Sequence, residues 1–134
     1  MHYIDITLIS LYRKKMMNKK DIGQYYETLA VEHLKTHGYE ILCRNFRTKF
    51  GEIDIIAKDK KDNCISFIEV RYRKNLFFGL PKETVNFNKQ IRLIKSAMVF
   101  VKQNKIKNMY LRFDVISITD IEIEHIKNAF YARV

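Results

Sequence analysis

Two carboxylates lie in stretches of the sequence that are otherwise apolar. Asp54 follows Ile53 and precedes two further isoleucines, and Glu69 lies between Ile68 and Val70. Burying an unpaired charge in a strand is costly, and two carboxylates brought together repel each other unless a divalent cation is bound. Because hard oxygen ligands favour Mg²⁺ or Mn²⁺ over zinc, the pair predicts a magnesium or manganese site.

Cations follow the second of these carboxylates at a spacing of two residues. In a strand this spacing places Glu69, Arg71 and Arg73 on one face. A metal ion that polarises a phosphoryl oxygen, next to a cation that stabilises developing charge, is what hydrolysis of a phosphodiester requires. The same spacing is compatible with a structural ion network in which Asp54 and Glu69 pair with Arg71 or Arg47.

Positive charge is concentrated in the segment that contains both carboxylates. The chain of 134 residues has a net charge of +10, and residues 41–107 hold 16 basic against 6 acidic residues. Such an excess usually serves an anionic partner, although a solvated lysine-rich surface gives the same count. We therefore expect a phosphate-binding face for an anionic partner such as a nucleic acid or an acidic lipid, of which the nucleic acid suits the surrounded carboxylates better. The basic residues expected on this face are Arg44, Arg47, Lys49, Arg71, Arg73, Lys74, Lys89 and Arg92.

Length and composition exclude several classes of protein. The length suits one domain, and 47% hydrophobic residues suffice for a sizeable core. Cys43 and Cys64 are too few for a disulfide scaffold. No apolar stretch approaches the roughly 18 residues of a membrane span, and the opening lacks a secretory pattern. We expect a cytoplasmic protein without a membrane partner, in which residues 1–17 form a non-essential or flexible extension to a single domain at 18–134.

The elements that must position these side chains follow from apolar periodicity. A helix is expected over 20–37, ended by Gly38, and a second helix from an N-cap at Asn88 to about residue 103. Strands are expected over 39–48, 52–57, 64–73, 111–118 and 122–130, the last as a strand or a turn. The order α-β-β-β-α-β-β predicts an α/β fold with one central mixed β-sheet flanked by helices. A charged hairpin loop at 58–63 would bring the two strand carboxylates together.

Aromatic residues and a third strand carboxylate complete the candidate set. Tyr72, Phe77 and Phe78 lie beside the basic strand and either pack in the core or stack on nucleic-acid bases. Asp114 lies in an apolar strand, where we expect it to pair with an arginine of the neighbouring strand. Other aromatic residues are expected in the core, namely Tyr25, Tyr26, Tyr39, Phe46, Phe50 and Phe67.

Short motifs along the chain resemble those of one protein family. In order, they are GQYYETLA at 23–30, GYEILCRNFR at 38–47, GEIDIIA at 51–57, FIEVRYR at 67–73, FG at 78–79 and RFDVI at 112–116. Together they resemble the YraN family of small bacterial proteins, which is grouped with the PD-(D/E)XK nuclease superfamily. The resemblance covers most of the chain outside its first residues. It implies a restriction-endonuclease-like fold, similar in outline to archaeal Holliday-junction resolvases.

The resemblance also implies a metal-dependent endonuclease and assigns its site residues. A glutamate of the first helix joins the metal site in such nucleases, and Glu27 occupies that position. The acidic residues of the signature correspond to Asp54 and Glu69, so these three carboxylates are expected to hold Mg²⁺ or Mn²⁺. The substrate implied is DNA, including branched or structured DNA. Because junction-resolving enzymes act as dimers, a homodimer is implied as well, whereas no small-molecule cofactor is expected.

One position departs from the signature. Its lysine falls at position 71, which is Arg71 in this sequence. Arginine keeps the charge and can bind a phosphate through two hydrogen bonds, but it does not act as a base. Lys89 or Lys74 could supply the missing lysine, leaving Arg71 to stabilise charge. The alternative to a nuclease is a catalytically inactive nucleic-acid-binding module of the same fold.

Overall fold

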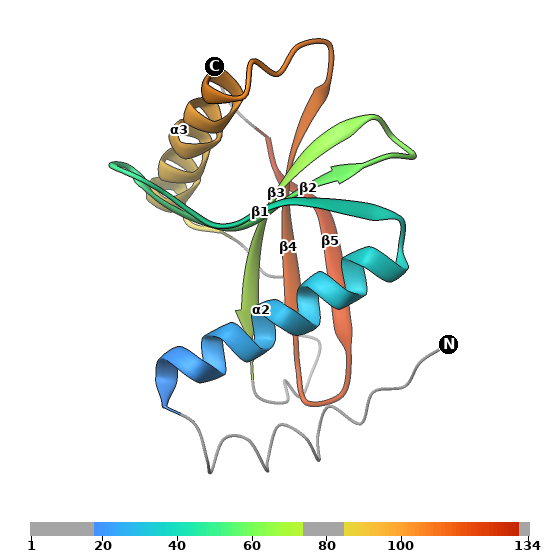
Figure 1. The fold of residues 1–134 in the computed structure, drawn as a ribbon. Helices are drawn as coiled ribbons and strands as arrows, with labels where there is room; N and C mark the ends of the chain where they lie inside the picture. The colour runs from blue at the N-terminus through green and yellow to red at the C-terminus, as the bar shows by residue number, and fades with distance from the viewer. Residues whose placement is uncertain (1–17, 74–84, 132–134) are drawn as a thin grey trace.

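The computed structural model describes residues 18–73 and 85–131 of the chain, and Figure 1 shows their arrangement. The extension expected at 1–17 lies outside these residues, as do Lys74, Phe77 and Phe78. The elements are α2 (Lys19–Thr36), β1 (Tyr39–Thr48), β2 (Gly51–Asp59), β3 (Cys64–Tyr72), α3 (Phe87–Gln103), β4 (Tyr110–Ile118) and β5 (Ile123–Phe130). This order is the predicted one, and the final segment is a strand.

The five strands form one mixed sheet in the order β1-β2-β3-β4-β5. All neighbours are antiparallel except β3 and β4, which are parallel. Parallel neighbours need a long crossover connection, and α3 lies within it. The α/β class and the central mixed sheet flanked by helices are confirmed. Among the described residues, no helix is long and apolar enough to cross a bilayer.

Helix α2 covers one face of the sheet (Figure 1). Its N-cap is Asn18, whose side chain accepts a hydrogen bond from the N–H of Asp21 at 2.9 Å. Gly38, at φ +84°, follows its end in the left-handed region that glycine adopts without strain. On the face toward the sheet, Ala30 and Leu34 are fully buried in a core shared with β2, β3 and β4. The helix predicted over 20–37 is therefore confirmed to within one residue at each end.

Helix α3 covers the opposite face of the sheet (Figure 1). Leu93, Ala97 and Phe100 pack there in a second core. The prediction of Asn88 as its N-cap is wrong, because the cap is Asn86. Asn86 has the extended backbone of an N-cap, and its side-chain oxygen accepts the N–H of Lys89 at 2.9 Å.

A buried polar network on the α2 face connects all five strands, and in it Ser66 of β3 donates to Asp114 of β4. Arg112 of β4 donates to Asp59 of β2 at 3.0 Å and to the hydroxyl of Tyr39 on β1 at 2.6 Å. It also pairs with Asp114 at 2.9 Å, and His125 of β5 lies 2.8 Å from the same carboxylate. Asp114 therefore pairs with an arginine, but on its own strand and not on the neighbouring one as expected. Residues two apart share a face of a strand, which explains the difference.

Candidate active site

Strands β2 and β3 stop pairing where the two predicted carboxylates lie. The last paired residues are Ile55 and Ile68, and the same antiparallel register continued by one residue would place Asp54 opposite Glu69. In place of a backbone partner, Asp54 Oδ2 accepts the N–H of Val70 at 2.8 Å. The sheet therefore opens at this point, and the carboxylates stand on the two sides of the opening.

Glu69 is buried and held by two cations. Arg71 donates to its Oε2 from Nη2 at 3.1 Å and from Nε at 3.2 Å. Lys89, in the first turn of α3, forms an ion pair with Oε1. A carboxylate with 7% of its residue surface exposed needs such partners, because an uncompensated charge there would be costly. The structural ion network considered from the sequence is thus present at Glu69.

Asp54 has a different electrostatic environment. Within the described residues it takes part in no ion pair. Burial, followed by repulsion from Glu27, Glu69 and Glu52, raises its pKa to about 7, against the opposing effect of the hydrogen bond from Val70. This side of the opening therefore carries an excess of negative charge, which a cation would stabilise.

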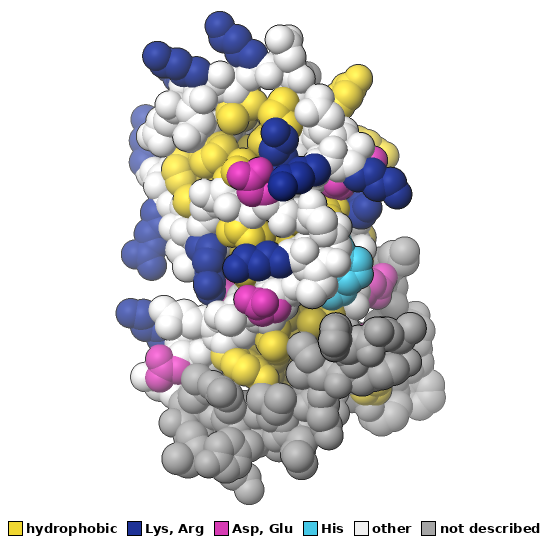
Figure 2. Space-filling view, turned by 45° about the vertical axis from the view of Figure 1, so that its right-hand side comes forward, with side chains coloured by type: hydrophobic (Ala, Val, Ile, Leu, Met, Phe, Trp, Pro, Cys, Tyr) yellow, Lys and Arg dark blue, Asp and Glu magenta, His cyan; other side chains and the backbone are white. Residues whose placement is uncertain are grey.

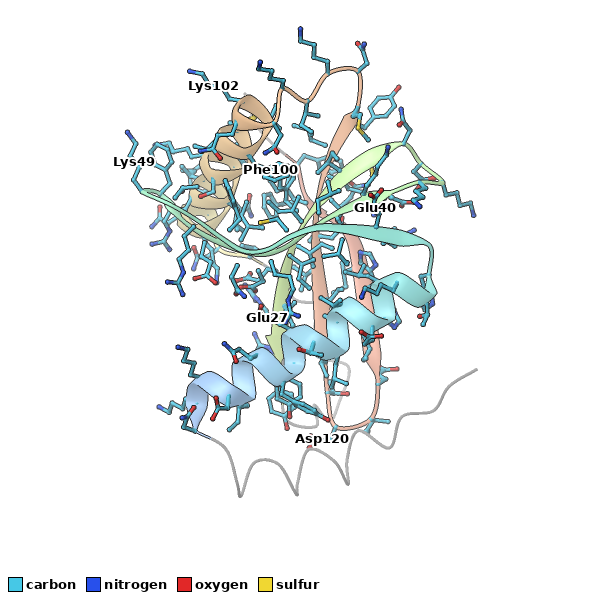
Figure 3. The ribbon with its side chains drawn as sticks, viewed as in Figure 1. Glu27, Glu40, Lys49, Phe100, Lys102 and Asp120 are labelled. Atoms are coloured by element: carbon cyan, nitrogen blue, oxygen red, sulfur yellow. The ribbon has the colours of Figure 1, made fainter. Side chains whose placement is uncertain are left out.

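Glu27 lies on the side of α2 that faces the sheet (Figure 3). Its Oε1 is buried and has no hydrogen-bond partner among the described residues. Burial raises the pKa of Glu27 and the charge of Glu52 adds to this effect, whereas Arg44 and a hydrogen bond with Asn45 oppose it. A buried carboxylate oxygen without a protein partner is unusual, and a water molecule or a cation at this position would satisfy it.

We tested whether these residues suit a divalent metal ion. Glu27, Asp54 and Glu69 offer hard oxygen donors, one of them an orphaned buried oxygen, around a carboxyl destabilised by its neighbours. Across residues 18–73 and 85–131, however, no three acidic, His or Cys side chains stand close enough to hold one ion. The donor chemistry fits Mg²⁺ or Mn²⁺, while Arg71 and Lys89 engage both oxygens of Glu69 in this structure.

A pocket of about 380 Å³ lies over the opening between β2 and β3. Its polar lining consists of Glu52, Asp54, Glu69, Lys89 and Arg92. Phe50, Gly51 and Leu93 form the rest of the wall. The pocket thus lies between the β1–β2 hairpin and the first half of α3, on the α3 face of the sheet. Glu27 is not among its lining residues, so it would reach a metal from the α2 side.

The structure brings only some of the predicted phosphate-binding residues to this pocket. Lys89 and Arg92 line it, and the ammonium of Lys49 lies 5.2 Å from the centre of the ring of Phe50, which forms part of its wall. Arg44 instead donates to Thr28 on α2 at 3.1 Å. Figure 2 shows basic side chains spread over the visible face with acidic side chains between them.

Arg47 on β1 and Arg73, directly after β3, are two further described members of that set. Arg47 forms an exposed ion pair with Glu52 at 3.3 Å. Arg73 follows β3, and its backbone N–H donates to the carbonyl of Ile118 at 2.8 Å. The sign of the charge alone could not separate basic residues at the pocket from those elsewhere on the surface.

Two residues that line the pocket were not predicted from the sequence as site residues. Glu52 lies two residues before Asp54, and period-two alternation could have placed it on the same side. Phe50 was expected in the core, yet it is half-buried and lines the pocket. Tyr72, one candidate for base stacking, instead packs on Tyr26 of α2 with ring centres 4.1 Å apart, on the face opposite Glu69.

Comparison with known proteins identifies the family. The model of the family described as "Uncharacterised protein family UPF0102" matches residues 26–118. A UPF0102 protein of Clostridium botulinum (strain 657 / Type Ba4) is 48% identical over 118 residues, covering 83% of this chain and 94% of the relative. A relative from Thermodesulfovibrio yellowstonii is 50% identical over 115 residues, covering 86% and 100%. One from Caldicellulosiruptor bescii is 52% identical over 103 residues, covering 76% and 85%.

These similarities extend over most of both chains in each pair, and they agree with the motifs noted in the sequence. The PD-(D/E)XK superfamily placement expected from those motifs is consistent with the family. The chain therefore belongs to the UPF0102 family, the YraN-like family that its motifs predicted.

Proposed function

We propose that the protein is a metal-dependent, endonuclease-like phosphodiesterase that acts on DNA, including branched or structured DNA. The observation that carries this proposal is the opening of the sheet at Asp54 and Glu69, inside one pocket with Lys89 and Arg92. Carboxylates for a hard cation and basic groups for a phosphate are the two components that phosphodiester hydrolysis needs. They occur here within a single concave site.

Each side chain has a distinct role in this proposal. Asp54 and Glu69 hold Mg²⁺ or Mn²⁺, and Glu27 holds it from the α2 side or orders the attacking water. When bound, the metal supplies Lewis-acid activation of the phosphate and lowers the pKa of a water molecule. Arg71 donates to a phosphate oxygen and stabilises negative charge as the reaction proceeds.

Lys89 supplies the lysine that position 71 lacks. The ammonium of Lys89 already forms an ion pair with Glu69, although Lys89 lies on α3 and not on β3. A lysine on this helix can reach the same oxygens as one placed two residues along the strand, because the face of β3 that carries Glu69 and Arg71 packs under α3. Lys74, the other candidate, lies outside the described residues.

Phosphates on either side of the cleaved bond would contact the remaining basic residues. Arg92 lines the pocket and Lys49 lies beside Phe50 in its wall, whereas Arg44, Arg47 and Arg73 would meet phosphates farther from the site. Binding of this kind weakens as salt is added, since each neutralised phosphate releases counterions. A homodimer, which would present two such sites to two strands, is part of the proposal by resemblance.

One observation favours a second candidate, a catalytically inactive nucleic-acid-binding module. Both oxygens of Glu69 are engaged by Arg71 and Lys89, and no three donors converge among the described residues. In such a module these ion pairs would be permanent, and the pocket would bind a phosphate without a metal.

Cleavage assays on the full chain separate the two candidates. We would incubate it with branched, single-stranded and duplex DNA in Mg²⁺ or Mn²⁺, beside Asp54→Asn and Glu69→Gln. Glu32→Gln, on an exposed part of α2, is a control with the same loss of charge. Cleavage that is lost in the first two variants and kept in the control supports the nuclease. Equal background in all proteins, with salt-sensitive binding intact, supports the binding module.

A further inference from the structure

We propose that the pocket accepts one unpaired nucleotide, whose base stacks on Phe50 while its phosphate lies toward Arg92 and the strand carboxylates. This inference rests on the proposed binding of nucleic acid and specifies its substrate class as strands with unpaired nucleotides. Phe50 is the aromatic ring in the pocket lining, and neither the motifs nor the metal chemistry assigns it a role.

The hairpin tip that carries Phe50 is fixed against α3. Thr48 and Ser96 share a hydrogen bond of 2.8 Å between their hydroxyl oxygens, and Ser96 is fully buried. Thr48 Oγ1 also accepts the N–H of Phe50 at 3.0 Å. Gly51, at φ +149°, has a backbone conformation that favours glycine. A Cβ atom added there would lie 3.8 Å from Cβ of Arg92, so the hairpin approaches α3 at this residue as well. The ring is therefore presented by a docked hairpin, which limits the entropy lost when a ligand stacks on it.

The surroundings of the ring are those of a nucleic-acid contact. The ammonium groups of Lys49 and Lys95 lie 5.2 and 5.4 Å from its centre, and both lysines are exposed. These cations can turn to phosphates while a base occupies the ring, because long exposed side chains change rotamer freely. Aromatic rings combined with cations are how proteins bind single strands without strict sequence preference.

The pocket arranges this aromatic wall and the candidate catalytic groups within one small volume. At about 380 Å³ it falls within the usual range for small-ligand sites, roughly 300–1,000 Å³. Asp54 and Glu69 lie at its strand side, Phe50 forms a wall on its hairpin side, and Arg92 lines its α3 side. A base inside a closed duplex cannot enter such a pocket without being unstacked and unpaired, which costs a few kcal/mol. An unpaired base enters without that cost.

The consequence is a preference for single strands, gaps and branch points over closed duplexes. Stacking on an aromatic ring depends on the base and not on the sugar, so DNA and RNA share this chemistry. The proposal does not require the metal, because the ring and the cations belong to the chain itself.

The sequence contains no tryptophan, which permits a direct test. Phe50→Trp in the full chain introduces a single indole, whose fluorescence is quenched when a base stacks on it. We would titrate this variant with oligo(dT), with oligo(rU) and with a duplex, in EDTA so that cleavage does not contribute. Tyr110→Trp, at an exposed aromatic position on β4 outside the pocket lining, is the matched control. Quenching by either single strand in the first variant, and not in the control, supports the proposal.

Binding measured by fluorescence anisotropy supplies the second arm. Phe50→Ala is expected to weaken binding of the single strand by roughly 5- to 150-fold, the range that loss of one base–aromatic contact produces. Duplex binding by the same variant, and single-strand binding by Tyr110→Ala, should stay close to wild type. The proposal is overturned if Phe50→Ala binds the single strand as tightly as wild type, or if bound single strands leave the indole at position 50 unquenched.

Failure of this inference is distinguishable from failure of the proposed nuclease. Cleavage that depends on Asp54 but is unchanged in Phe50→Ala would retain the nuclease and reject the stacking site. Quenching at position 50 in a protein that cleaves no DNA would retain the stacking site and leave the inactive binding module as the function.

Discussion

Lys89 of α3 pairs with Glu69 of β3, so the helix that crosses over the sheet supplies a cation to the carboxylate at its centre. The N-cap at Asn86 fixes where this helix begins and therefore which residues of its first turn face the strand. The polypeptide thus places a lysine and an acidic residue in contact although 20 positions separate them in the sequence. This contact is the basis of the first prediction.

Replacing Lys89 with methionine should reduce DNA cleavage much more than stability. The methionine keeps the length of the side chain but removes the ammonium that we assign to the reaction. The loss of one such cationic group is expected to lower the cleavage rate roughly 100-fold. Lys89 is partly exposed and Glu69 keeps Arg71, so the free energy of unfolding should change by about 1 kcal/mol or less.

Single-turnover cleavage and urea unfolding of the same preparations check this prediction. Lys102→Met, on an exposed part of the last turn of α3, is the control for removal of a lysine from this helix. Equal cleavage by wild type and Lys89→Met would remove Lys89 from the reaction. Loss of the folded state in that variant would instead make the ion pair structural.

How much of this site could be predicted from the sequence depends on the physical cause of each feature. Asp54 and Glu69 were visible because a charge inside an apolar strand is costly and needs a reason. The strands themselves followed from period-two patterns and the turn formers between them. The order of the strands in the sheet and the crossover by α3 between the parallel strands β3 and β4 were not predicted and come from the fold.

Contacts between distant elements could not be predicted in the same way. The sequence offered two asparagines near the start of α3, and only the fold shows that Asn86 is the cap. It likewise offered Lys74 and Lys89 as equivalent lysines. Phe50 is a large apolar residue of the kind expected in a core, and its position at the pocket depends on how the hairpin docks against Ser96. These are tertiary choices that local periodicity does not encode.

Magnesium should stabilise the wild-type protein and not the Asp54→Asn variant. Burial together with the charges of Glu27, Glu69 and Glu52 makes an ionised Asp54 unfavourable, so in EDTA the uncharged asparagine should raise the free energy of unfolding. Asparagine can still accept the N–H of Val70, which keeps the local geometry. A ligand that binds only the folded state stabilises it by about 2.7 kcal/mol at 100 times its dissociation constant.

Thermal unfolding with and without Mg²⁺ measures this effect independently of any cleavage. We expect a higher melting temperature with Mg²⁺ for wild type and for Glu32→Gln, and no change for Asp54→Asn. The same measurement with Ca²⁺, a second hard cation that binds oxygen ligands, repeats the comparison. If Mg²⁺ shifted the wild type and Asp54→Asn equally, Asp54 would not be a metal ligand.

The buried network around Arg112 predicts how stability depends on pH. Burial tends to raise the pKa of Asp114, but hydrogen bonds from His125, Arg112 and Ser66 outweigh it and hold that pKa below its usual value. A depressed carboxyl pKa stabilises the fold above the unfolded value of about 4, and this contribution is lost as the pH falls further. Wild type should therefore lose stability steeply below about pH 4.

Asp114→Asn should destabilise the protein by about 3–5 kcal/mol at pH 7, because it leaves the buried guanidinium of Arg112 without its closest carboxylate. Below about pH 4 the variant should lose less stability than wild type does. Urea unfolding at pH 7, 4 and 3 tests both statements. Parallel curves for the two proteins over this range would show that Asp114 does not control acid unfolding.

Restoring the lysine of the signature with Arg71→Lys should raise the rate of DNA cleavage. Arg71 binds Oε2 of Glu69 through both Nε and Nη2, whereas a lysine offers a single ammonium and would leave that oxygen more available to a metal ion. Lysine can also transfer a proton, which arginine does not do, and we expect an increase of roughly tenfold. Single-turnover rates with the same branched DNA measure it, with Arg71→Gln as the matched loss of charge. A slower reaction in Arg71→Lys than in wild type would mean that the two-pronged contact of arginine is itself required, and that this site has adapted to the residue it carries.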